Sequence, residues 1–124
     1  METCRRNTVR RRVLSLHKTV RKHFGEVVTV SQEVQDIISS PIVKEAIINN
    51  SDCKILLDQR KFMNRFDSIQ TLLGLTNKEK SQILSINMSN HPGRNYKEVW
   101  IGLGGVQSAV YATEVSRQEY LVRP

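Results

Sequence analysis

The pattern of apolar and polar positions along the chain predicts strands and helices in alternation. Residues 27–30 form a short, nearly continuous β-branched run, typical of a strand buried on both faces of a parallel sheet. Residues 53–57 predict a second buried strand, and the segment between the two runs predicts helix, first over 32–39 and then from Ser40-Pro41 onward. This order of elements predicts a βαβ unit with parallel strands and a right-handed crossover.

Helical periodicity also marks segments on either side of this unit. Apolar positions between residues 14 and 24 share one helix face, and Gly25 is predicted to end that helix. A longer apolar stripe runs from Phe62 to Leu73 and stops at Gly74. Thr76 and Glu79 have the spacing of a capping box, which predicts that another helix starts there.

The C-terminal part of the chain predicts a β-hairpin. Apolar residues recur through 99–103 and 106–110 on either side of Gly104-Gly105, so this glycine-rich stretch is interpreted as a hairpin turn rather than a phosphate cradle. Residues 87–95 are predicted to form a loop and residues 116–121 a short final helix. The predicted fold class is therefore α/β, ending in a hairpin.

The net excess of positive charge is confined to the first fifth of the chain. Residues 1–24 hold eight of the 19 lysines and arginines and one of the 12 acids, so they carry the whole formal excess of +7. The remaining residues are neutral, which excludes a basic field over the body of the protein. An arm over residues 1–15 that contacts DNA or an acidic partner is one interpretation, with Arg5, Arg6, Arg10, Arg11 and Arg12 as the contacting residues.

Several kinds of site have no signature in the sequence. No glycine is followed by lysine, so the Gly-x-x-x-x-Gly-Lys-Ser/Thr phosphate-binding loop is missing. Asp58 follows an apolar run but is succeeded by Gln59, so it is a weak match to a magnesium-binding Asp-Glu pair. Cys4 and Cys53 lie far apart without a Cys-x-x-Cys spacing, so neither a metal site nor a disulfide is expected, and Cys53 is predicted to be a buried strand residue.

Ser31 and Gln32 are the candidate ligand-binding residues from position alone. They follow the predicted strand 27–30 directly, and ligands of open α/β sheets bind outside the carboxyl ends of the strands. The alternative is an ordinary strand exit with a helix cap. No apolar run is long enough to span a bilayer, and no secretory signal is present, so a cytoplasmic location is expected.

Long stretches of the chain resemble TraG-type conjugative transposon ATPases, relatives of the large cytoplasmic ATPase of type IV secretion systems. The resemblance extends from about residue 16 to residue 120. It is carried by Lys-Thr-Val-Arg-Lys at 18–22, by the run from Val-Thr-Val-Ser-Gln to Leu-Leu-Asp-Gln at 28–59, by Leu-Gly-Leu-Thr at 73–76 and by residues 96–105 and 108–115.

The resemblance implies a RecA-like P-loop core in a hexameric ATPase that uses ATP and magnesium to power conjugative DNA transfer and pilus assembly. It implies that Gln32, preceded by Ser31, senses the γ-phosphate, because a neutral amide can hydrogen-bond that phosphate or the attacking water. It also implies that Arg94 acts on the nucleotide of a neighbouring subunit. The location implied is the cytoplasm, or the inner-membrane surface through the secretion machinery.

The chain departs from the family at its start, because full-length members carry the P-loop and the Asp-Glu strand upstream of the matching segment. Residues 16–124 are therefore expected to be the C-terminal part of the ATPase core, truncated, with no tight binding or hydrolysis of ATP by this chain alone. Residues 1–15 are expected to be a non-matching basic arm. Either a shifted reading frame or a genuine DNA-binding arm accounts for its composition, and the coding DNA upstream of residue 16 distinguishes them.

Overall fold

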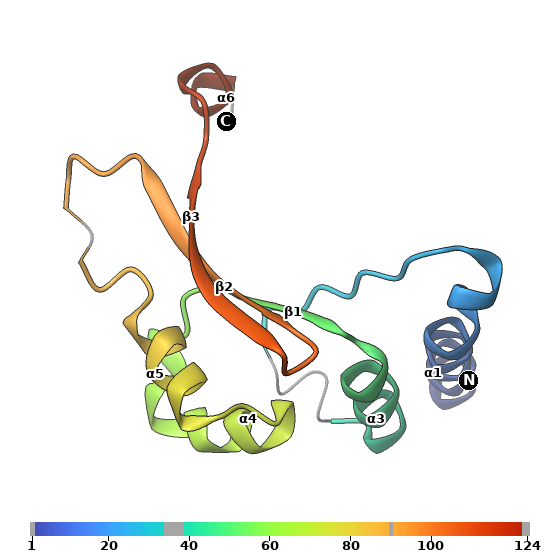
Figure 1. Ribbon diagram of the computed structural model, residues 1–124. Coiled ribbons are helices and arrows are strands. Elements are labelled where there is room, and N and C mark those ends of the chain that lie inside the picture. Colours follow the sequence, from blue (N-terminus) through green and yellow to red (C-terminus); the bar gives the residue numbers. More distant parts are fainter. Residues whose placement is uncertain (1, 34–38, 90, 123–124) are drawn as a thin grey trace. The chain divides into compact units, whose positions relative to one another are not determined.

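The computed structural model describes residues 2–33, 39–89 and 91–122, and it divides into two compact units (Figure 1). The first unit spans Met1–Asp52 and the second spans Cys53–Pro124.

The first unit is built on two helices that lie against each other, α1 (Glu2–Thr19) and α3 (Pro41–Asn50). A 3-10 turn, η1 (Val20–His23), continues α1 and ends at Phe24, whose backbone has φ 55°. The stop predicted at Gly25 is thus one residue late, and the amide of Gly25 donates to the carbonyl of Val20 at 3.1 Å. An ion pair between Arg21 and Asp52 links the end of this helix to the end of the unit.

The predicted start of α3 is confirmed. Ser40 is the N-cap residue with an extended backbone, and Pro41 occupies the first helical position, where its missing amide costs nothing. The amide of Lys44 donates to the carbonyl of Ser40 at 2.9 Å, and the Ser40 side chain is buried. Ala46 and Ile47 supply the buried apolar face of the helix.

Residues 27–30 are not a strand in the structure. They lie outside any ladder of the described residues, and Val28 and Val30 are 84% and 88% exposed. β-propensity describes fitness for a half-buried pleated surface, and a strand also needs a hydrogen-bonded neighbour. The predicted βαβ unit is therefore wrong for the described residues, and the helix predicted over 32–39 falls largely on residues 34–38, outside them.

The basic N-terminal segment is more regular than its composition predicts. Residues from Glu2 onward are helical, although residues 1–15 have no apolar periodicity. Arginine is a good helix former because its straight stem loses little rotamer freedom in a helix. A helix of this kind does not require the apolar stripe on which the sequence interpretation relied.

The second unit contains a three-stranded antiparallel sheet in the order β1-β2-β3. The strands are β1 (Cys53–Leu56), β2 (Tyr96–Leu103) and β3 (Gln107–Glu114). The predicted hairpin is confirmed, with Gly104 and Gly105 at φ 54° and 72°, values that favour glycine. The prediction of parallel strands is wrong for this sheet, because Ile55 opposes Ile101 and Leu56 opposes Trp100 in an antiparallel register.

Two helices and a 3-10 segment connect β1 to β2: η2 (Arg60–Arg65), α4 (Phe66–Leu73) and α5 (Asn77–Ser85). Gly74 ends α4 with φ 65°, as predicted, and Thr76 and Glu79 form the predicted capping box at the start of α5. Lys80 pairs with Asp67, which joins α5 to α4. A last short helix, α6 (Arg117–Val122), follows β3 close to its predicted position.

The core of the second unit lies between these helices and one face of the sheet. Four large side chains are fully buried there: Trp100, Phe66, Ile83 and Ile86. The Trp100 indole Nε1 donates to Gln82 Oε1 on α5 at 3.3 Å, so the buried ring also has its polar atom satisfied. Cys53 is exposed, which corrects the prediction that it is buried. Among the described residues, no helix has the length and apolar character needed to cross a membrane.

Candidate functional site

Ser31 and Gln32, the residues predicted to bind nucleotide, are exposed in the first unit. Ser31 Oγ donates to the carbonyl of Glu33 at 2.7 Å, a local bond of the kind that serine makes in turns. Gln32 lies at a bend of the chain rather than at the end of a buried strand. The exposed amide is open to solvent, but the sheet edge that would aim it at a ligand is not formed by the described residues.

Arg94, the second candidate, belongs to the second unit and lies just before β2. Its guanidinium carbon is 5.1 Å from the centroid of the Tyr96 ring, within the range of a cation–π contact. Its backbone amide donates to the carbonyl of His91 at 3.0 Å. Two contacts therefore restrain Arg94 beside Tyr96. Gln32 belongs to the first unit and Arg94 to the second.

Asn87 and Glu98 form a reciprocal clasp that the sequence interpretation missed. The backbone amide of Asn87 donates to Glu98 Oε2 at 2.8 Å, and the backbone amide of Glu98 donates to Asn87 Oδ1 at 2.9 Å. Asn87 is buried and has φ 59°, a left-handed conformation that asparagine tolerates better than most residues. The clasp joins the end of the α5 region to β2 and closes the loop that carries Arg94.

Asp58, the weak match to a magnesium ligand, has a structural partner instead. Its carboxylate accepts bonds from the Arg60 side chain, with Arg60 Nε 2.9 Å from both oxygens. The hydrogen bond from Arg60 is the main cause that lowers the pKa of Asp58, and a bond from the Asn87 side chain lowers it further. The carboxylate therefore helps to anchor the turn after β1. The described residues contain no group of three or more metal-binding side chains.

The capping box of α5 lies near charged and polar groups of the sheet. A backbone hydrogen bond from Thr76 is the first cause that lowers the pKa of Glu79, and Ser108 on β3 and the charge of Lys54 on β1 lower it further. The Thr76 amide donates to Glu79 Oε2 at 2.8 Å. Glu79 thus caps the start of α5, and groups on two strands favour its charged form.

The predicted basic arm is presented on α1. The backbone of all five arginines lies within this helix, and the side chains of Arg11 and Arg12 are exposed. At 3.6 residues per turn, the positions 5, 6, 10, 11 and 12 are spread around the helix axis rather than along one stripe. This spacing allows contact with an extended polyanion but does not define a surface shaped for one groove.

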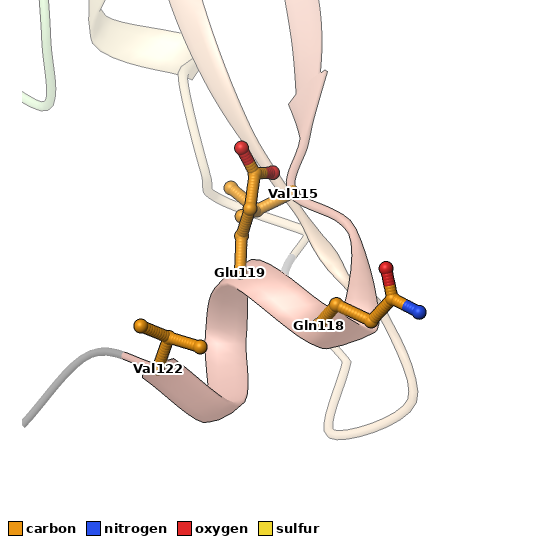
Figure 2. Close-up of a pocket in the computed structure, with 4 residues that line it drawn as sticks. All are labelled: Val115, Gln118, Glu119 and Val122. Atoms are coloured by element: carbon orange, nitrogen blue, oxygen red, sulfur yellow. The ribbon is translucent and has the colours of Figure 1, made fainter.

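An open depression lies beside α6 and is lined by Val115, Gln118, Glu119 and Val122 (Figure 2). Figure 2 shows that Gln118 points away from Glu119, so the two polar groups do not converge. The Glu119 carboxylate instead accepts two hydrogen bonds from Ser116, one from the Ser116 Oγ at 3.2 Å and one from the Ser116 backbone amide at 3.3 Å. Glu119 therefore helps to cap the helix. The depression carries no arrangement suited to catalysis.

The sequence matches the model of a known protein family. The model of the TraG P-loop domain matches residues 4–123, nearly the whole chain. The chain belongs to the TraG P-loop domain family. The matched range starts at residue 4, within the segment for which the sequence alone predicted no match. No curated protein and no solved structure matches the chain.

Membership of the TraG P-loop domain family associates the chain with P-loop NTPases of conjugative transfer, whose full-length members bind nucleotide and magnesium. Ser31, Gln32 and Arg94 all fall inside the matched range.

Proposed function

We propose that this chain provides the C-terminal part of a RecA-like ATPase core that powers conjugative DNA transfer, and that it does not hydrolyse ATP by itself. The observation that carries the proposal is the match of the TraG P-loop domain to residues 4–123. The lack of a Gly-Lys-Ser/Thr sequence and of an Asp-Glu pair after an apolar run supports the second part. Phosphoryl transfer depends on the backbone cradle and the magnesium ion that these motifs hold.

In a complete core, Gln32 is the proposed sensor of the γ-phosphate, with Ser31 beside it. Residues 27–30 lie outside any ladder of the described residues, and Val28 and Val30 are exposed, which leaves this segment available to join a parallel sheet. Joining such a sheet would turn the bend at Gln32 into a strand end and direct its amide to the nucleotide. Arg94, restrained by Tyr96, is the proposed cation that reaches the nucleotide of a neighbouring subunit in a homo-oligomer.

The experiment has two arms. The purified chain is incubated with Mg-ATP, and phosphate release is expected to stay at the level of buffer. Turnover that depends on magnesium and is lost in Gln32→Ala would overturn the proposal that the chain is inactive alone.

The second arm replaces the glutamine equivalent to Gln32 by alanine in a full-length relative. Turnover is expected to fall by about 10²-fold with little change in nucleotide binding, because the amide acts mainly in the transition state. The position equivalent to Gln118, exposed on α6, is the matched control and should leave turnover unchanged. Equal turnover of both variants and the parent protein would remove the sensor role of Gln32.

A second candidate function is DNA contact by α1, favoured by the exposure of Arg11 and Arg12 on a helix. Binding to a labelled duplex should fall steeply as salt rises from about 50 to about 200 mM, since released counterions drive such binding. Arg11→Glu/Arg12→Glu should weaken it much more than Lys61→Glu/Arg65→Glu, which changes the net charge equally at exposed residues outside α1. Equal losses in the two variants would assign binding to net charge alone.

A further inference from the structure

The β2–β3 hairpin extends past the third strand of its sheet. β1 pairs only with residues 100–103 of β2, so residues 96–99 and 111–114 form a ribbon of two strands (Figure 1). A two-stranded ribbon is only marginally stable in water, and further strands normally support it. The exposed state of Tyr111, Thr113 and Glu114 agrees with this lack of support.

The outer edge of β3 lacks the basic residues and prolines that often protect free strand edges. Its eight residues include no lysine, arginine or proline, and its single charge is Glu114 at the last position. Within the part of the chain that the structure describes, β3 pairs with β2 alone. Its outward backbone groups form a row suited to another extended strand.

The middle of the sheet face opposite Trp100 is apolar, between Lys97 and Thr113 at one end and Gln107 at the other, and would continue across such a strand. Side chains alternate along a strand, so Ile55, Ile101 and Ala109, which oppose one another in register, share this face. Leu103 and Tyr111 lie on the same face. Ile55 is 60% exposed, and Leu103 and Tyr111 are each 48% exposed.

We propose that β3 pairs antiparallel with β3 of a second copy of this chain, joining two three-stranded sheets across a two-fold axis. A two-fold axis perpendicular to the sheet keeps each face of the joined sheet continuous. With the axis at the middle of β3, either Val110 or Tyr111 lies opposite the same residue of the other copy. Glu114 then lies opposite Val106 or Ser108, and no acid of β3 faces another acid. This self-complementarity favours a second copy over an unrelated extended peptide.

The mass of the full chain in solution tests the pairing. Light scattering coupled to size exclusion should give twice the 14.3 kDa chain mass at micromolar concentration, with dissociation on dilution. Tyr111→Lys should weaken the dimer by about tenfold or more, because two like charges then meet near the axis. Ala112→Lys tests the other face of the same edge, and Met63→Lys, at an exposed residue of η2, should leave the dimer intact.

Fluorescence of Trp100 and far-ultraviolet circular dichroism identify the variants that remain folded. A chain that is monomeric at all concentrations, or a dimer that both lysine variants leave unchanged, would overturn the proposal.

Cross-linking locates the axis. In a Cys4→Ser/Cys53→Ser background, either Val110→Cys or Tyr111→Cys should form a disulfide-linked dimer on mild oxidation, because directly opposed residues lie about 4.5–5.5 Å apart at Cα. Thr113→Cys should stay monomeric under the same conditions, since its position meets residue 107 or 109 of the other copy. Failure of both self-opposed positions to cross-link would contradict the two-fold pairing. None of these measurements depends on ATP chemistry, so their outcome is separate from that of the turnover assays.

Discussion

Replacing Gly102 by alanine should destabilise the second unit through a direct collision with its buried tryptophan. A Cβ built on Gly102 lies 2.3 Å from Trp100 Cη2 and 2.9 Å from Cζ3. Side chains two residues apart on a strand share a face, so the indole of Trp100 lies over Gly102. The ring is 1% exposed, and its Nε1 is bonded to Gln82, so moving it disturbs both the core and that hydrogen bond.

The expected cost follows from two opposing effects. Overpacking a buried site typically costs about 1–3 kcal/mol, whereas removing the flexibility of a glycine from the unfolded chain stabilises by about 0.4–1 kcal/mol. The collision dominates because the neighbouring atoms belong to a buried ring rather than to the end of a flexible side chain. Each kcal/mol lost should lower the melting temperature by about 4–8 °C for a unit of this size.

The assay is urea or thermal unfolding followed by tryptophan fluorescence, which reports on this site alone because Trp100 is the only tryptophan. Gly93→Ala is the matched control: nothing lies within 4 Å of the added Cβ, so its stability should be unchanged or slightly raised. Trp100→Phe should make Gly102→Ala less costly, a coupling that a double-mutant cycle measures when unfolding is followed by far-ultraviolet circular dichroism, which does not need the tryptophan. A Gly102→Ala variant as stable as the parent, with unchanged emission, would refute the reasoning.

Three further changes probe the polar contacts of the second unit. Asn87→Ala should lower the free energy of unfolding by about 1–3 kcal/mol, measured in urea, because the buried acceptor for the Glu98 amide is lost; a neutral result would show that the clasp adds no stability. Thr76→Ala should cost about 0.5–2 kcal/mol in the same assay through the lost cap of α5, while an equal loss in Thr71→Ala would argue against the capping explanation. The pKa of Asp58 lies below its ordinary value of 3.8, so the ionised carboxylate stabilises the fold above that pH. The difference in the free energy of unfolding between the parent and Asp58→Asn should therefore vanish as the pH falls further. A difference that does not depend on pH would contradict this linkage.

The candidate site was predictable in part. The sequence singles out Ser31 and Gln32 because polar residues directly follow an apolar β-branched run, and it marks Arg94 through family resemblance. Nothing in the local sequence indicates the Tyr96 contact of Arg94 or the Asn87–Glu98 clasp, since the residues of the clasp are eleven positions apart and meet only when the loop closes.

The sequence by itself determined the features whose physical cause lies within a few residues. Gly74 ends α4 because a left-handed C-cap favours glycine, Thr76 and Glu79 cap α5 through reciprocal bonds, and Gly104-Gly105 turn the hairpin. The start of α3 at Pro41 follows from the same kind of local signal.

Only the tertiary structure decided which extended segments became strands and in which direction they paired. Residues 27–30 have a stronger β-branched pattern than β1, yet the structure gives β1 a partner in β2 and leaves residues 27–30 without a strand partner among the residues it describes. Strand pairing satisfies backbone groups with partners far along the chain, so local propensity cannot select the partner or its direction. The exposure of Cys53 and the position of Trp100 over Gly102 depend on the same long-range register.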